Sequence, residues 1–134
     1  MYDDNDLQRL YGKKYFSHRT RPEMWDRRAE FVSEKFNPKT ALDIGCASGE
    51  FVKSMIDVKI DAYGIDGSDF AISNTNKSIK NKILKVNLNS DPFPFEDETF
   101  DFVGSFYSVE HIHNIEFFSK ELFRTLKKAG NAWF

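Results

Sequence analysis

Hydrophobic residues in the first helix-like segment of the chain recur at helical spacing. Between Pro22 and Phe36 they stand three or four positions apart, which places them on one face of an amphipathic helix. These apolar positions are Trp25, Ala29, Val32 and Phe36. Proline suits the first turn of a helix and Asn37-Pro38 is typical of its end, so the pattern predicts a helix over residues 22–36.

Beyond residue 38, short apolar runs alternate with helical spacing. The short runs predict buried strands, because they are bounded by turn residues and are too brief for a buried helix. They cover residues 39–44, 62–65, 83–86 and 100–106, and the letters N-A-W-F at 131–134 resemble the start of a fifth strand. Residues 87–99 contain Asp91-Pro92 and Pro94, which predict a loop.

Three segments between these strands have the features of helices. Residues 50–56 carry apolar side chains at helical spacing, and Ser68 is a plausible N-cap for a short helix after it. A longer helix is predicted from Ile115 to Leu126, with Lys127-Lys128 in its last turn and Gly130 as the C′ residue that closes it.

Strands that alternate with helices predict a parallel sheet with crossover helices. The expected fold is therefore α/β, a Rossmann-like, doubly wound, mostly parallel sheet. Because the sequence stops where a fifth strand begins, we expect the domain to be shortened at its C-terminal end. We expect one domain, in which residues 1–38 form a helical lead-in or lid and residues 39–134 form the ligand-binding part.

Composition excludes several classes of partner. With 40% hydrophobic residues and 30% charged residues in 134, the chain has the balance of a globular domain. The formal net charge of −2 gives no sign of the basic face that nucleic acid requires. A single cysteine, Cys46, and no apolar run of membrane-spanning length favour the cytoplasm, with no membrane as partner.

The most informative segment is A-L-D-I-G-C-A-S-G-E-F at residues 41–51, where a strand meets a helix. Gly45 and Gly49 let the backbone turn tightly and let a ligand approach closely. The spacing is G-x-x-x-G rather than the G-x-G-x-x-G of dinucleotide binders, and Asp43 precedes the first glycine by two residues. A carboxylate there repels a pyrophosphate and favours a ligand with an amine or a sulfonium. The alternative is that Asp43 is a structural acid bonded to amides of the loop.

A second acid ends the next predicted strand. Asp66 in Y-G-I-D-G-S follows the glycine segment by about 20 residues, the separation at which an acid accepts hydrogen bonds from ribose hydroxyls. The alternative is a capping role at the helix that follows.

Four segments in this order resemble the motifs of class I S-adenosylmethionine-dependent methyltransferases of the small-molecule, ubiquinone-biosynthesis-like type. They are D-I-G-C-A-S-G at 43–49, G-I-D-G-S at 64–68, N-L-N-S-D-P-F-P-F-E-D-E-T-F-D at 87–101 and S-V-E-H-I at 108–112. Together they run from about residue 41 to the end of the sequence. One such motif is a weak signal, and four in order are a strong one.

The resemblance implies a binding site for S-adenosylmethionine. It places the glycine loop along the methionine part of the cofactor, the acid after the second strand on the ribose, and the residues after the third strand on the adenine. The residues in these positions are Asp43, Gly45, Cys46, Ala47 and Gly49, then Asp66 and Gly67, then Asn87 and Leu88. Two of them depart from the usual pattern: Ala47 replaces a glycine, and Asn87 replaces the acid that commonly accepts from the adenine amino group.

Two further regions are candidates for roles near the reacting groups. His111 follows the fourth strand and is a candidate general base, although a helix-start histidine in a hydrogen-bond network is an equally simple interpretation. A metal site at Glu110, His111 and His113 has no other support. In the lead-in, Tyr15 and Arg19 are candidates to cover the cofactor, the aromatic ring beside the sulfonium and the guanidinium on the carboxylate. The alternative for this segment is simple packing.

The resemblance implies transfer of a methyl group from S-adenosylmethionine to an acceptor that the sequence does not identify, with a small molecule favoured. One rival is a shortened, non-catalytic module that binds the cofactor or a partner. Its apolar edge at Trp133 and Phe134 would favour pairing with another chain, which a second copy could supply. The other is a nicotinamide-dependent oxidoreductase, against which Asp43 and the missing third glycine both argue.

Overall fold

The computed structural model describes residues 4–10, 12, 13 and 22–134, and within them five strands form one sheet. Every neighbouring pair is parallel, and the strand order is β3-β2-β1-β4-β5. The strands are β1 (Thr40–Ile44), β2 (Asp61–Asp66), β3 (Ile83–Lys85), β4 (Phe100–Gly104) and β5 (Leu126–Trp133). The α/β doubly wound fold is confirmed, and β1 to β4 lie within two residues of their predicted bounds.

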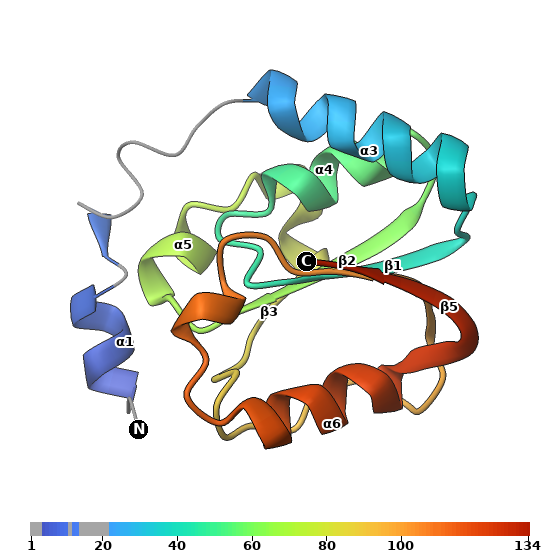
Figure 1. The fold of residues 1–134 in the computed structure, drawn as a ribbon. Coiled ribbons are helices and arrows are strands. Elements are labelled where there is room, and N and C mark those ends of the chain that lie inside the picture. The colour runs from blue at the N-terminus through green and yellow to red at the C-terminus, as the bar shows by residue number, and fades with distance from the viewer. Residues whose placement is uncertain (1–3, 11, 14–21) are drawn as a thin grey trace.

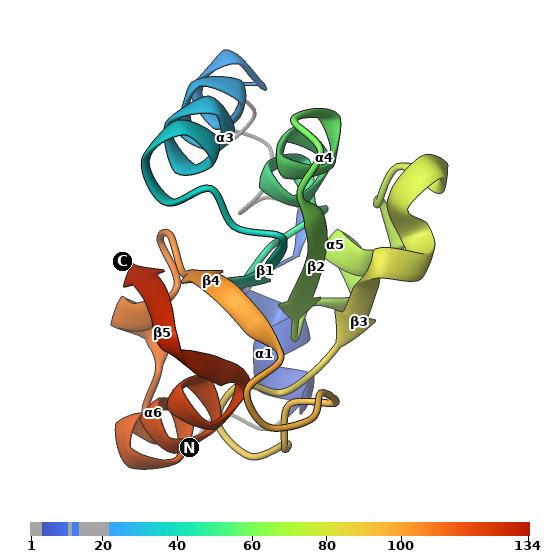
Figure 2. The same ribbon diagram turned by 90° about the vertical axis from the view of Figure 1, so that its right-hand side faces the viewer.

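Helices cover both faces of the sheet (Figure 1). One face carries α3 (Pro22–Phe36) and α4 (Glu50–Asp57), and the other carries α6 (Ile115–Thr125). Figure 2 shows the strands between these two layers. A separate buried cluster fills each interface: Ala29, Val32 and Phe51 belong to the α3–α4 side, and Phe118 and Leu122 to the α6 side. Because α3 shares a core with α4, this helix is part of the packed domain.

Three short elements were not predicted: α1 (Asp4–Leu10) and the 3-10 helices η1 (Lys77–Lys82) and η2 (Val109–His111). Of these, α1 lies near the carboxyl end of β2 (Figure 1). The Gln8 side chain donates to the Gly67 carbonyl at 2.8 Å and accepts from the Asp69 N–H at 2.5 Å. Short α5 (Asp69–Ser73) begins there, and the Ser68 hydroxyl caps it by accepting from the Ala71 N–H, as the sequence predicted.

The predicted end of the last helix is wrong. The helix α6 stops at Thr125, so Leu126 and Gly130 belong to β5 and not to a helix and its C′ position. The carbonyls of Arg124 and Thr125 accept from the Glu98 and Thr99 N–H groups, which draws the chain directly into the sheet. A register shift between Phe100 and Phe102 of β4 takes up the extra residues of β5.

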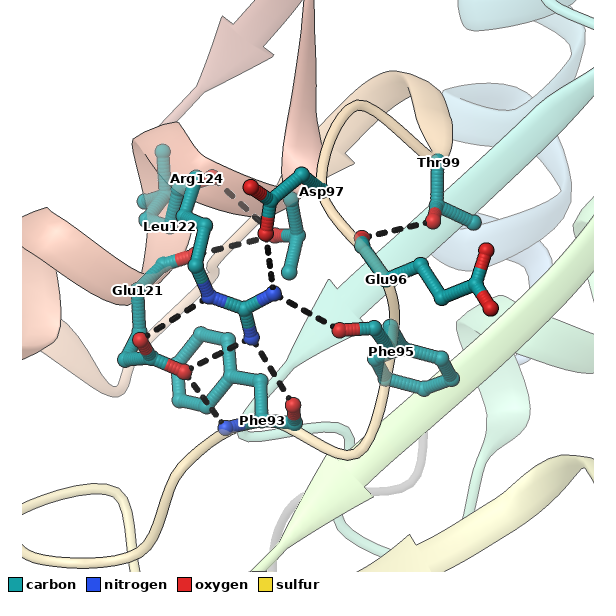
Figure 3. A network of polar contacts seen from close by, with 9 residues as sticks. Phe93, Phe95, Glu96, Asp97, Thr99, Glu121, Leu122 and Arg124 are labelled. Carbon is teal, nitrogen blue, oxygen red and sulfur yellow. Dashed lines mark hydrogen bonds and ion pairs between the residues drawn. The ribbon is translucent and has the colours of Figure 1, made fainter.

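The loop between β3 and β4 is fastened to the end of α6 by one arginine (Figure 3). Arg124 donates to the carbonyls of Phe93 and Phe95 at 2.9 and 2.8 Å and pairs with Asp97 at 3.0 Å. It also pairs with Glu121, whose carboxylate accepts from the Phe93 N–H at 2.7 Å. Every nitrogen of this guanidinium therefore has an acceptor.

None of the helices in the described ranges has both the length and the apolar character that a membrane crossing needs.

Candidate functional site

The segment between β1 and α4 forms a tight loop at the carboxyl end of the sheet. Three of its residues have positive φ: Gly45 at 74°, Ala47 at 52° and Gly49 at 86°. The Gly45 and Cys46 N–H groups donate to the Ile65 carbonyl of β2 at 2.8 and 3.1 Å. These bonds fix the loop against the neighbouring strand, so that its turn lies between the ends of β1 and β2.

Both glycines of the loop are required by space as well as by conformation. A Cβ on Gly45 would collide with the Ser108 side chain, and one on Gly49 would lie 2.9 Å from Ile83 Cδ1. Ala47 also has a left-handed conformation. Only glycine adopts this conformation freely, so it carries a modest energetic cost at Ala47. The loop therefore has the sharp turn for which the sequence pattern was interpreted.

Asp66, the last residue of β2, is bonded to the same loop. Its carboxylate accepts from the Ala47 N–H at 2.9 Å and from the Ser68 N–H at 2.8 Å. Burial raises the pKa of Asp66, and hydrogen bonds from the Ser68, Ala47 and Gly67 N–H groups act in the opposite direction. Since Ser68 is the N-cap of α5, the proposed alternative of a capping role for Asp66 is not what the structure shows. Asp66 instead joins the glycine loop to the end of β2.

Asp43 differs from Asp66 in the hydrogen bonding of its carboxylate. It lies on β1, 4% exposed, and its carboxylate makes no hydrogen bond with any residue that the structure describes. Burial raises its pKa well above the ordinary value, the carboxylates of Asp66 and Glu50 raise it further, and Arg28 lowers it. The alternative in which amides of the loop bond Asp43 therefore fails. A buried acid without a partner is costly unless a ligand supplies one.

The residues after β3 form a turn beside this loop. The Asn87 amide oxygen accepts from the Asn89 N–H at 3.1 Å, and the Asn87 N–H donates to Asp91 at 2.9 Å. The oxygen is therefore already in use, with room for a second donor. The Leu88 N–H has no hydrogen-bond acceptor within the described ranges. Leu88 is one of the two residues that the resemblance places on the adenine.

Asn89 links that turn to the segment after β4. Its side-chain oxygen accepts from the His113 and Asn114 N–H groups at 2.7 and 3.1 Å, and Asn89 is 3% exposed. His111 lies in η2 between these points, half-buried, with its Nε2 atom 3.8 Å from a Glu110 oxygen. The structure thus places the candidate base at the carboxyl end of the sheet, where part-buried hydrogen bonds hold its neighbours His113 and Asn114.

Reasoning from sequence missed one charged residue at this end of the molecule. Arg28 of α3 lies among three aromatic rings, with its Cζ atom 4.9 Å from the Trp25 centroid, 4.7 Å from Phe106 and 5.4 Å from Tyr107. Its Nη2 atom donates to the Tyr107 hydroxyl at 3.1 Å, whereas its Nη1 atom is buried without a hydrogen-bond partner in the part of the chain that the structure describes. The available signal was position: Arg28 follows Trp25 by three residues, on the apolar face of the helix.

The remaining candidate residues are Cys46, Gly67, Tyr15 and Arg19. Burial raises the pKa of the Cys46 thiol well above its ordinary value, which favours the neutral thiol over the reactive thiolate. Gly67 follows Asp66 and is bonded to α1 through Gln8. Tyr15 and Arg19 lie outside the described residues. In the described ranges no three side chains of the metal-binding types are grouped as ligands.

Comparison with known proteins gives the family. The methyltransferase-domain family matches residues 42–134. Over 91 residues the chain is 34% identical to the ubiquinone biosynthesis O-methyltransferase of Pelagibacter ubique, covering 66% of this chain and 38% of that protein. Over 94 residues it is 33% identical to sterol 4-C-methyltransferase strm-1 of Caenorhabditis elegans, covering 66% of this chain and 28% of that protein.

A solved structure shows the same fold. It is that of a Methanococcus maripaludis protein described as an S-adenosyl-L-methionine-dependent methyltransferase, with a TM-score of 0.74 and 20% identity over 98% of this chain and 63% of that one. The chain thus spans well under half the length of the two curated relatives. The family match nevertheless covers most of the sequence and includes the glycine loop, Asp66 and His111. The chain belongs to the class I S-adenosylmethionine-dependent methyltransferase family.

Proposed function

We propose that this chain binds S-adenosylmethionine at the carboxyl ends of β1, β2 and β3 and transfers its methyl group to a small-molecule acceptor. The observation that carries the proposal is the contrast between two acids at this edge. Asp66 is fixed to the glycine loop by the Ala47 N–H at 2.9 Å, whereas Asp43 is buried without a hydrogen bond to any of the described residues. A cofactor with a cationic amine and sulfonium supplies the positive charge that Asp43 lacks.

The residues present fit the parts of this cofactor in strand order. Asp43 and the loop of Gly45, Cys46, Ala47 and Gly49 would lie along its methionine part. Asp66, with Gly67, would accept from the ribose hydroxyls through the carboxylate lone pairs that its bonds to the backbone leave available. Asn87 and the free Leu88 N–H would face the adenine.

The bound cofactor supplies an activated methyl group on a positively charged sulfur. The protein then has to orient an acceptor in line with that group and exclude water. We assign His111 to the acceptor as the base that takes its proton, since η2 follows β4 and lies beside the glycine loop through Ser108. Tyr15 and Arg19 are proposed to cover the cofactor, and the cytoplasm remains the predicted location.

Self-association belongs to the same proposal. The strand β5 lies at an edge of the sheet, and Phe134 beside it is 59% exposed. An unpaired edge with apolar side chains favours pairing with a second copy. Light scattering over a range of concentrations tests it: we expect a dimer fraction that grows with concentration, and a monomer throughout would exclude it.

Calorimetric titration with S-adenosylhomocysteine tests the cofactor site. We expect the wild-type protein to bind and Asp66→Ala to lose about a hundredfold in affinity, because the ribose acceptor and the loop anchor disappear together. Asp61→Ala is the matched control. Asp61 lies at the opposite end of β2 from Asp66, is exposed and pairs with Lys82. A folded wild-type sample that does not bind would contradict the proposal and favour a non-catalytic module.

A further inference from the structure

Asn89 joins the turn after β3 to the segment that begins α6. Its side-chain oxygen accepts from the His113 N–H at 2.7 Å and from the Asn114 N–H at 3.1 Å. Its backbone carbonyl accepts from the Asn114 side-chain amide at 3.3 Å. An amide oxygen has two lone pairs, and both are in use here. Three hydrogen bonds to this buried residue therefore fix the start of α6.

The same residue belongs to the turn that the proposed function assigns to the adenine. The Asn89 N–H donates to the Asn87 side-chain oxygen at 3.1 Å, and the Asp91 N–H donates to the Asn87 carbonyl at 2.8 Å. Leu88 lies between the two asparagines, and its side chain packs against the buried cluster on the α6 side. A ligand that binds the Leu88 N–H therefore contacts a stretch of backbone that Asn89 itself helps to hold.

His111 lies between two anchored points of the chain. Before it, the Ser108 hydroxyl is 3.4 Å from the carbonyl oxygens of Ile44 and Gly45, at the end of β1 and the start of the glycine loop. After it, Asn89 bonds the N–H groups of the two residues at positions 113 and 114. The candidate base therefore lies between the glycine loop and the turn after β3, the two parts that the proposed function assigns to the donor.

The helix η2 is too short to fix the direction of His111 by itself. It has three residues, and a single turn of 3-10 helix is not stable alone. Val109 and Ile112 pack against the buried cluster on the α6 side, which holds the segment on the domain. Apolar packing has no preferred direction, whereas hydrogen bonds have a strong one. The orientation of the segment therefore depends on the bonds at its two ends, and Asn89 provides those at the second.

We propose that Asn89 is a positioning residue for His111, a role that rests on the proposed function. Donor binding at the Leu88 N–H stabilises the turn after β3. Asn89 extends that stabilisation to the segment of His111, because its oxygen holds two N–H groups of this segment. Small errors in the placement of a base lower the rate of the step that it assists. Asn89 therefore couples the presence of the donor to the orientation of the group that takes the acceptor's proton.

Amide hydrogen exchange followed by NMR tests this coupling. The amides to observe are those of His111 and Ile112, which donate to carbonyl groups at the start of η2 and not to Asn89. Exchange is measured with and without saturating S-adenosylhomocysteine, and calorimetry establishes that the ligand is bound. In the wild type we expect the ligand to slow the exchange of both amides by about tenfold, since local opening of this segment must then also disturb the bound turn.

Two variants of Asn89 separate the acceptor oxygen from the size of the side chain. Asn89→Leu keeps the size and removes the oxygen, so we expect the ligand-induced slowing to disappear even when the ligand saturates the protein. Asn89→Asp keeps the acceptor lone pairs, and a negative charge at the N-terminus of α6 is favourable, so this variant should retain most of the slowing. Asn81→Leu is the matched control, because Asn81 is exposed and precedes β3, and it should respond as the wild type does.

A purely structural role of Asn89 gives a different result. Asn89→Leu would then speed the exchange by the same factor with and without the ligand, and the ratio between the two rates would remain that of the wild type. Full ligand-induced slowing in folded Asn89→Leu therefore overturns the proposal. So does a wild type that binds S-adenosylhomocysteine without slower exchange at His111 and Ile112.

Circular dichroism establishes the folding of each variant, and if Asn89→Leu does not fold, Asn114→Asp decides. This milder change keeps the side-chain oxygen that accepts from the Phe117 N–H and removes the donor to the Asn89 carbonyl. Partial loss of the slowing supports the proposal, and an undiminished response overturns it. A wild type that does not bind S-adenosylhomocysteine contradicts the proposed function, and the positioning role of Asn89 falls with it.

Discussion

The acids at the two ends of the sheet have opposite environments. At the amino end of β4, Asp101 accepts from the Lys39 and Thr40 N–H groups at 2.9 and 3.1 Å and from Lys127 Nζ at 2.9 Å. Partial burial alone would raise its pKa, but these bonds outweigh burial and lower the pKa to about 2. Near the carboxyl end of the adjacent strand, Asp43 has no such bonds with the described residues, and burial raises its pKa.

The same contrast separates two arginines. Arg124, near the amino end, uses all three guanidinium nitrogens on carbonyl and carboxylate acceptors (Figure 3). Among the described residues, the Nη1 atom of Arg28 at the carboxyl end has no acceptor. Satisfied polar groups stabilise the fold, and unsatisfied ones lower its stability unless a ligand completes them. We infer that the charged groups with hydrogen-bond partners stabilise the fold, and that those without partners bind a ligand. Three substitutions test this distinction.

The largest effect is expected from Arg124→Met. This change leaves Glu121, which is 6% exposed, with the Phe93 N–H as its remaining partner and frees the loop before β4. Removing one member of a buried pair should lower the free energy of unfolding by about 3 kcal/mol. Urea denaturation measures it, with the exposed Lys120→Met as control. A loss below about 1 kcal/mol would show that this end of the sheet is not the stabilising one.

A smaller and pH-dependent loss is expected from Asp101→Asn. The folded-state pKa of about 2 lies below the ordinary value of 3.8, so the ionised form stabilises the fold above about pH 4. The variant should lose about 2 kcal/mol at pH 7, and its deficit should shrink as the pH falls from about 4 to about 2. Urea denaturation of both proteins at pH 7 and pH 3 measures the change. A deficit that is the same at both pH values would contradict the assignment.

Much of the fold could be predicted from the sequence, because a buried strand or helix face has a recognisable local pattern of apolar residues. The runs that became β1 to β4 are short and apolar, and α3 shows helical spacing over its whole length. At the junction of α6 and β5, no local pattern shows where the helix ends. Leu126 continues the spacing of Leu122, and Gly130 resembles a helix end, so periodicity extends the helix. What ends it are hydrogen bonds from Glu98 and Thr99, which are distant in sequence.

The sequence predicted those residues of the candidate site whose positions admit few residue types. Gly45 and Gly49 are required by positive φ and by crowding, and the acid at the end of β2 lies where the spacing from the loop placed it. Arg28 was missed because an arginine on a helix normally belongs to the solvent face. Only its position beside Trp25, together with aromatic residues from the far segment after β4, makes it a partly buried charge.

The most direct test of the account is Asp43→Asn, measured for both stability and binding. Because the folded-state pKa of Asp43 is raised, its charge destabilises the fold as pH rises above the ordinary value. At pH 7, removing the charge should raise the free energy of unfolding of the ligand-free protein by about 1 kcal/mol, the smallest of the three effects. At the same pH it should weaken binding of S-adenosylhomocysteine by about tenfold. A variant that is less stable than the wild type, or that binds equally well, would contradict the claim that this end of the sheet holds its charge for a ligand.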